Sequence, residues 1–244
     1  MTKKAWIIFS VLCIALVAGM IWLGRSDQID VSDVDQNAVQ AAEARNGNIA
    51  DHTYGKMDSK VVIIEYGDFQ CPGCASAAPV FAQVKETYRD KVLFVFRNYP
   101  LTTIHPNALA SAAAVEAAGL QGKYWEMHDI IYSTQDSWKD LTGVDRTNFF
   151  VARANEIGAD GDKLKADLEN PDIRKKINFD LALGSKAGVT GTPSFYLNGE
   201  EIKAVFIDGK IVPAGTKDAR QVWTDAEAFG KLIIEPALKE AGIE

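Results

Sequence analysis

Two cysteines stand three positions apart in this sequence, Cys71 and Cys74. The apolar, β-branched run Val61–Tyr66 just before them predicts a buried strand, and the alanine-rich pattern after them predicts a helix. A C-x-x-C pair between a strand and a helix is typical of a centre that exchanges thiols and disulfides. The sequence therefore predicts redox chemistry at Cys71 and Cys74.

The start of a helix favours a thiolate over a thiol. We expect Cys71 to face unpaired backbone N–H groups and the positive end of the helix dipole, which both lower the pKa of a thiol. The thiolate attacks in disulfide exchange, and Cys74, one turn further on, can resolve a mixed disulfide. Pro72 fixes the loop between the cysteines, and Gly73 adds no bulk. A purely structural disulfide is the alternative, but closing so short a loop adds little stability.

Two further positions carry candidate chemistry. Glu65 is an acid inside the apolar run, where a buried charge would be costly. We interpret it as an acid of raised pKa that accepts or relays the proton of Cys74; the alternative is a side chain that points outward at a strand edge. Thr192 and Pro193 open a later strand. A trans proline would make an ordinary turn there, whereas a cis proline facing the cysteines would expose the Thr192 backbone to an extended substrate.

Metal and nucleic-acid chemistry are not expected. A metal site would need a second pair of Cys or His ligands, and the remaining cysteine, Cys13, lies in an apolar stretch. We therefore expect no metal, and no cofactor beyond the redox-active pair. From Ser26 onward the chain holds 23 basic and 33 acidic residues, because Lys3, Lys4 and Arg25 are three of the 26 basic ones. That acidic balance disfavours binding to nucleic acid or anionic lipid.

The N-terminus predicts a membrane anchor. Lys3 and Lys4 precede twenty uncharged residues, Ala5–Gly24, and Arg25 follows them. Twenty apolar residues span a hydrocarbon core of about 30 Å, and no small-x-small cleavage site follows the span. We expect residues 1–25 to form a cytoplasmic stub and an uncleaved transmembrane signal anchor, with late cleavage as the alternative. The rest of the chain would then be extracytoplasmic, held at the cell membrane by a single pass.

The segments around the cysteine motif differ in pattern. Residues 26–48 are polar and acidic and predict a tether with one short helix at Asn37–Arg45. Residues 49–60 predict an irregular lead-in to the first strand. Lys91–Phe96 predicts a second strand, which would complete a βαβ unit with the first strand and a helix that runs to about Arg89.

The pattern from residue 106 to 187 is almost entirely helical. Breakers divide it into five predicted helices, Ala108–Ala118, Trp125–Tyr132, Asp145–Ile157, Asp162–Glu169 and Asp172–Ala187. So long a helical stretch between strand patterns predicts a helical insertion within an α/β fold.

Strand patterns return after the helical stretch. Pro193–Leu197 and Glu201–Phe206 flank Asn198-Gly199, the strongest short signal for a hairpin turn. Asp225–Ala241 predicts a closing amphipathic helix, which Pro236 kinks or divides.

In this combination the chain resembles the DsbA-like thiol–disulfide oxidoreductases, and most closely the membrane-anchored kind found in bacteria that export through a single membrane. The resemblance covers about residue 50 to the end. It is carried by five motifs: Ile64–Cys74 (IEYGDFQCPGC), Phe96–Leu101 (FRNYPL), Ile104-His105, Trp125–Asp129 (WEMHD) and Gly188–Phe195 (GVTGTPSF).

The resemblance implies a thioredoxin fold with an inserted all-helical subdomain, preceded by one N-terminal transmembrane helix. The first part of the thioredoxin domain would be residues 49–105, the helical insertion 106–187 and the second part 188–244. Cys71 would be the surface nucleophile, and Cys74 the buried resolving thiol.

The resemblance also assigns roles around the cysteines. Pro193 would be the cis proline, with Thr192 beside it at the substrate, and Glu65 would occupy the position of the family's buried acid. One position departs from the pattern: the familiar oxidase has a histidine before its second cysteine, where this chain has Gly73. A histidine there stabilises the thiolate, so its absence bears on how strongly the pair oxidises.

Three functions are compatible with these residues. An extracytoplasmic oxidase would pass its disulfide to unfolded exported proteins through a Cys71 mixed disulfide, and a quinone-linked membrane protein, DsbB-like or VKOR-like by the resemblance, would reoxidise it. A reductase or isomerase would instead be kept reduced by a membrane electron donor, as Gly73 suggests. A non-catalytic, chaperone-like binding module with structural cysteines is the third.

Overall fold

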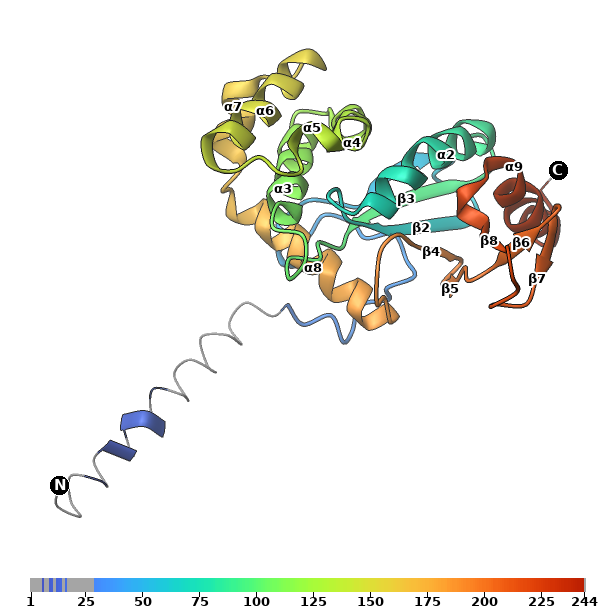
Figure 1. Cartoon of the computed structure of the whole chain (residues 1–244), viewed down its shortest axis with the longest axis horizontal. Coiled ribbons are helices and arrows are strands. Elements are labelled where there is room, and N and C mark those ends of the chain that lie inside the picture. The colour runs from blue at the N-terminus through green and yellow to red at the C-terminus, as the bar shows by residue number, and fades with distance from the viewer. Residues whose placement is uncertain (1–5, 7–8, 11, 15, 17–28, 244) are drawn as a thin grey trace.

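The computed structural model describes residues 29–243, together with positions 6, 9, 10, 12–14 and 16 (Figure 1). The predicted anchor at residues 1–25 falls mainly on other positions and so lies outside the described residues. Within the described part of the chain, no helix has both the length and the apolar character that crossing a bilayer requires.

A five-stranded sheet forms the centre of the fold, in the order β1-β3-β2-β4-β5. Its strands are β1 (His52–Gly55), β2 (Val62–Gly67), β3 (Leu93–Asn98), β4 (Ser194–Leu197) and β5 (Glu200–Glu201). β2 and β3 are parallel, and the other pairs are antiparallel. The predicted irregular lead-in at 49–60 is wrong over β1, which is short and partly polar and pairs with β3.

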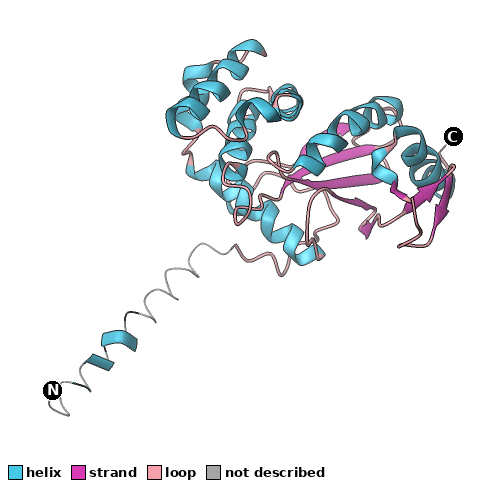
Figure 2. Ribbon diagram, in the orientation of Figure 1, coloured by secondary structure: helices cyan, strands magenta, loops and turns pink. Residues whose placement is uncertain are grey.

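Helices cover both faces of this sheet, because alternate side chains of β2 and β3 point to opposite sides. On one face α2 (Pro72–Tyr88) and the C-terminal helices pack over Ile63 and Phe94. On the other face α8 (Pro171–Ala187) packs over Ile64 and Tyr66. Figure 2 shows this arrangement of helix, sheet and helix. The βαβ unit predicted around the cysteines is therefore present as β2, α2 and β3.

The helical insertion predicted between residues 106 and 187 is present, and its last helix is α8. Before α8 it consists of α3 (Ala108–Gly119), α4 (Tyr124–Ser133), α5 (Gln135–Trp138), α6 (Gly143–Glu156) and α7 (Gly161–Asp167). In Figure 1 these helices gather beside the sheet, on the side where α2 begins. The single-turn helix α5 was not predicted, since four residues are too few for a periodic pattern.

The C-terminal part differs from the predicted strands. The turn at Asn198-Gly199 joins β4 to β5 as predicted, but the returning strand has only two residues in the central sheet. A second sheet then follows, in the order β7-β6-β8, from β6 (Val205–Ile207), β7 (Lys210–Val212) and β8 (Arg220–Gln221). The predicted strand at 201–206 is therefore divided between two sheets.

The closing helix is divided, as Pro236 predicts. α9 (Ala226–Phe229) passes through a π-helical segment (Gly230–Ile234) into α10 (Glu235–Glu240), and Pro236 lies in the first turn of α10. Proline is tolerated there because its missing N–H would have no partner in the first turn.

The segment before β1 packs on the domain instead of standing away from it. Lys186 on α8 donates to the carbonyl oxygens of Val31, Ser32 and Val34, at 3.0, 2.9 and 2.7 Å. The predicted helix at 37–45 is wrong: the described helical structure there is one 3₁₀ turn, Ala44–Asn46. From Ile29 onward, the predicted tether is thus in contact with the fold.

A buried cluster of charges joins this segment, the sheet and the insertion. Arg97 on β3 pairs with Asp51 at 2.7 Å, and Lys176 on α8 pairs with Asp51 at 3.1 Å and with Asp180 at 2.6 Å. All four side chains are fully buried. Lys176 and Arg97 outweigh burial and lower the pKa of Asp51 to about 2. Removing one member would leave buried charge without its partner, so the cluster fixes α8 against β3.

Candidate active site

Cys71 caps the N-terminus of α2. Its backbone is extended, and Pro72 occupies the first turn, where a missing N–H is harmless. Its Sγ lies 3.3 Å from the carbonyl oxygen of Thr192. Hydrogen bonds from the Cys74 side chain, from Thr192 and from the backbone N–H groups of Cys74 and Gly73 outweigh burial and lower the pKa of Cys71 to about 5. At neutral pH the Cys71 sulfur is therefore a thiolate.

Cys74 lies one turn further along α2 and is fully buried. The backbone N–H of Asp68 points to its Sγ at 3.5 Å. Burial, followed by the interaction with Cys71, raises the pKa of Cys74 well above its usual value. The two thiols thus differ sharply: the pKa of the Cys71 thiol is lowered, so its sulfur can attack and leave as a thiolate, whereas the buried Cys74 thiol keeps its proton at neutral pH.

The Thr192–Pro193 peptide bond is cis, which is the form that the resemblance implied. The segment lies against the cysteine loop. A side-chain carbon built at Gly73 would stand 3.4 Å from Cδ of Pro193 and 3.6 Å from Sγ of Cys71, both ordinary contacts. The structure therefore brings Cys71, Gly73, Thr192 and Pro193 together, although 121 positions separate Cys71 from Thr192.

Glu65 is buried beneath the helix that carries the cysteines. It belongs to β2, which is flanked by β3 and β4, so the alternative of an outward side chain at a sheet edge is wrong. Its exposure is 5%. Burial raises the pKa of Glu65 to about 7, against the opposing effect of Lys85. Its charge also contributes to the raised pKa of Cys74. The carboxyl thus changes protonation near neutral pH.

Lys85 is a residue of this site that sequence reasoning missed. It lies on α2, is 7% exposed, and places Nζ 4.0 Å from the centre of the Trp125 ring. Burial lowers the pKa of Lys85, while Asp129 and Glu65 oppose that shift. The polar position within an otherwise apolar helix face was the only signal for it.

Two other missed residues hold the cysteine loop in shape. Gln135 on α5 donates through Nε2 to the carbonyl oxygens of Phe69 and Cys71, at 2.8 and 3.0 Å. Asp68 accepts from the backbone N–H of Leu101 at 2.9 Å and contacts Nδ1 of His105 at 2.7 Å. Asp68 immediately follows β2, in the loop that leads to Cys71, and this position was a signal for its role. Nothing local marks Gln135, which reaches the loop from the helical insertion.

The family comparison agrees with this geometry. The family model described as "Thioredoxin" matches residues 47–213, which is more than half of the chain. The chain therefore belongs to the thioredoxin family. A thioredoxin fold that places C-x-x-C at the start of a helix and a cis proline opposite it is the arrangement of thiol–disulfide oxidoreductases.

Solved structures of DsbA-like proteins have a fold similar to that of this chain. Oxidised BdbD from Bacillus subtilis matches with a TM-score of 0.60 at 20% identity, covering 83% of this chain and 98% of that one. The α-DsbA1 protein of Wolbachia pipientis matches with 0.59 at 24% identity, covering 79% and 93%. MdbA, a thiol–disulfide oxidoreductase from Corynebacterium diphtheriae, matches with 0.54 at 21% identity, covering 71% and 93%. The resemblance to a DsbA-like fold, predicted from sequence motifs, is confirmed.

The curated relatives are much longer proteins, and this chain matches only a segment of each. The Na(+)/H(+) antiporter NhaA 1 of Salinispora arenicola is 34% identical over 151 residues, which are 61% of this chain and 22% of the antiporter. NhaA 3 of Salinispora tropica is 35% identical over 149 residues, with the same shares. The chain thus spans less than a quarter of the length of these relatives, and the transport activity in their names belongs to them.

Proposed function

We propose that this protein is an extracytoplasmic thiol–disulfide oxidoreductase that introduces disulfides into exported polypeptides. The observation that carries the proposal is the difference between the two sulfurs, since the pKa of Cys71 is about 5 and that of Cys74 lies well above its usual value. A stable thiolate favours the reduced form of the protein, and a protein whose reduced form is stable gives its disulfide away.

The reaction transfers two electrons from the substrate to the protein. A substrate thiolate attacks Sγ of Cys71, the Cys71–Cys74 bond breaks, and the Cys74 sulfur leaves and takes up a proton. Glu65, whose pKa is about 7, is the group that supplies this proton. A second substrate thiolate then attacks the substrate sulfur of the mixed disulfide and expels Cys71 as a thiolate. The substrate leaves with a disulfide, and the protein is left as a dithiol.

The substrate polypeptide would lie along the cis-proline segment. Thr192 is separated from the start of β4 by Pro193 alone, and its carbonyl oxygen lies 3.3 Å from the Cys71 sulfur. An extended chain that pairs with this backbone would present its cysteine to Cys71 whatever its other side chains are. This geometry suits a protein that acts on many unfolded substrates.

Reoxidation requires an electron acceptor. We propose a quinone-linked membrane protein in this role, of the DsbB-like or VKOR-like kind. An anchor at residues 1–25 would tether the redox domain to the outer surface of the membrane that contains this acceptor. The reduced Cys71–Cys74 pair would then stay close to the acceptor.

Gly73 supports a second candidate, a reductase or isomerase kept reduced by a membrane electron donor. Equilibration of the pair against glutathione separates the two. The oxidase should show a reduction potential less negative than about −200 mV, and a value near that of thioredoxin, about −270 mV, would favour the reductase.

A further inference from the structure

A groove follows α2 away from the cysteine motif, between that helix and the helices α4 and α5. Its volume is about 730 Å³. The α2 side offers small or cyclic side chains: Pro72, Ala75, Ser76, Ala78, Pro79 and Ala82. Pro72 directly follows Cys71 in the chain, so one end of the groove lies at the residue next to the reacting cysteine. A chain held by Cys71 as a mixed disulfide could therefore extend from the sulfur into this groove.

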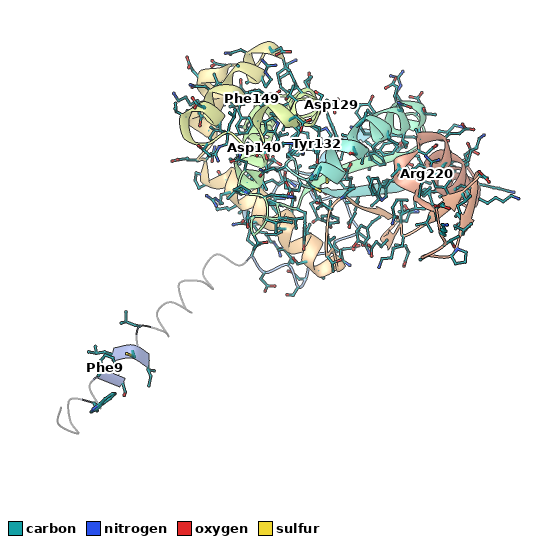
Figure 3. All side chains as sticks on the ribbon, viewed as in Figure 1. Phe9, Asp129, Tyr132, Asp140, Phe149 and Arg220 are labelled. Atoms are coloured by element: carbon teal, nitrogen blue, oxygen red, sulfur yellow. The ribbon has the colours of Figure 1, made fainter. Side chains whose placement is uncertain are left out.

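The opposite side of the groove is acidic. Glu126 and Asp129 on α4 and Asp136 on α5 all line it, and the described lining residues include no Lys, Arg or His. Figure 3 labels Asp129 and Tyr132 on α4, on the side of the insertion that faces α2. The groove therefore has small, largely apolar side chains on its α2 side and three carboxylates on the opposite side.

These carboxylates are available to a cation from outside. Glu126 and Asp136 pair with lysines three residues away, Lys123 at 3.0 Å and Lys139 at 2.6 Å, and their side chains remain 48% and 90% exposed. Asp129 accepts from Nδ1 of His128 at 2.8 Å and is 60% exposed. Exposed pairs of this kind contribute little to stability, so a substrate cation can replace or join the lysine at small cost.

We propose that this groove binds a positively charged segment of the substrate polypeptide, next to the cysteine that reacts with Cys71; the inference rests on the proposed function. The length of α2 along the groove determines how many substrate residues can lie in it. The ten residue steps of α2 from Pro72 to Ala82 extend about 15 Å, which equals four or five residues of extended chain. The protein thus prefers cysteines that have a Lys or Arg within about five positions. The apolar floor accepts the aliphatic stem of the basic side chain, and the carboxylates accept its charge.

The test compares two peptides that each carry two cysteines and differ only in having three Lys or three Glu within five positions of the first. The readout is the second-order rate constant for disulfide transfer from the oxidised protein. We expect the Lys peptide to react about three- to tenfold faster at low salt, and expect 0.5 M NaCl to reduce that ratio. In Glu126→Gln/Asp136→Asn the ratio should fall to about one third of its original value or less. Asp129 is left unchanged because its charge also acts on Lys85.

A matched control removes two carboxylates elsewhere. Asp90→Asn/Asp162→Asn makes the same change in net charge at exposed positions outside the groove and should keep the wild-type ratio. Equal rates for the two peptides, or a ratio that falls equally in both variants, would overturn the inference. Fluorescence anisotropy of the labelled peptides with Cys71→Ser/Cys74→Ser measures binding without redox chemistry. If the Lys peptide binds more tightly but the wild-type protein transfers no disulfide to it, the inference about the groove stands and the proposed function is wrong.

Discussion

The low pKa of Cys71 determines how the reduction potential of the pair depends on pH. Reduction of a disulfide takes up two electrons and as many protons as the two thiols bind at that pH. With the pKa of Cys71 at about 5 and that of Cys74 well above its usual value, only Cys74 binds a proton between pH 5.5 and 8. An unperturbed pair, with both pKa values near about 8.5, would bind nearly two protons over most of this range.

The magnitude follows from the two-electron relation, in which a tenfold change in the equilibrium constant is about 30 mV. One proton per reduction gives a slope of about −30 mV per pH unit, and two protons give about −59 mV. Between pH 5.5 and 8 the potential should therefore fall by about 75 mV, whereas an unperturbed pair would fall by nearly 150 mV. The slope should steepen only below about pH 5, where Cys71 itself becomes protonated.

The assay is equilibration with glutathione buffers at each pH, followed by acid quenching and counting of the free thiols. Glu65 titrates in the same range, since its pKa is about 7, so the series is repeated in Glu65→Gln. A slope near −59 mV per pH unit in both proteins would refute the stabilised thiolate and the oxidase argument built on it.

Three further predictions follow from the same environments. Glu65 keeps its proton up to about pH 7 in the folded protein, whereas in the unfolded chain it loses the proton near pH 4.5. The free energy of unfolding should therefore fall by about 3 kcal/mol as the pH rises across this window. Urea denaturation should show no such fall in Glu65→Gln, and an equal fall in both proteins would contradict the raised pKa of Glu65. Gly73→His should raise the potential by about 30 mV for each tenfold gain in thiolate stability, since a Cβ at this position makes only ordinary contacts and lies 3.6 Å from the Cys71 sulfur. An unchanged glutathione equilibrium would count against this prediction. Asp51→Asn should lower the free energy of unfolding by about 3–5 kcal/mol, because the buried Arg97 and Lys176 lose a counter-charge. A decrease below about 1 kcal/mol would show that the charge cluster does not stabilise the fold.

Local patterns were sufficient for the elements that carry the cysteines. Val61–Tyr66 is apolar because both faces of β2 are covered, and that run alone predicts a central strand. The turn at Asn198-Gly199 was predicted because both residues adopt positive φ angles, which this pair tolerates. The breaker Gly188 ends α8 in the left-handed conformation, as its position predicts.

Features that depend on distant parts of the chain could not be predicted in this way. β1 is a strand because β3 supplies its hydrogen-bond partners, and His52–Gly55 has no strand pattern of its own. Gln135 holds the cysteine loop across 64 positions of sequence. Asp51 and Lys176 are 125 positions apart, and the sequence around each residue predicts only an exposed charged side chain.

The site itself was predicted from two kinds of information. Spacing alone marked Cys71 and Cys74, and one acid in an apolar run marked Glu65. The cis form at Pro193 came from the resemblance, because the residues around it fit a trans turn equally well. Lys85 was missed because a lysine on a helix is usually exposed, and its burial beside Trp125 is visible only in the packed structure.

The central claim is that Cys71 attacks and is attacked, while Cys74 resolves. It is tested most directly by incubating reduced Cys74→Ala and reduced Cys71→Ala with unfolded polypeptides that carry a disulfide. A thiolate that attacks this disulfide forms a mixed disulfide and releases the second polypeptide sulfur as a thiolate, and the adducts are analysed on non-reducing gels and by mass spectrometry. With Cys13 also replaced by Ala in both proteins, the account predicts mixed disulfides on Cys71 in the Cys74→Ala protein, which lacks the resolving thiol. It predicts none on Cys74 in the Cys71→Ala protein, where the Cys74 sulfur is fully buried. Equal trapping in the two variants, or none in either, would contradict it.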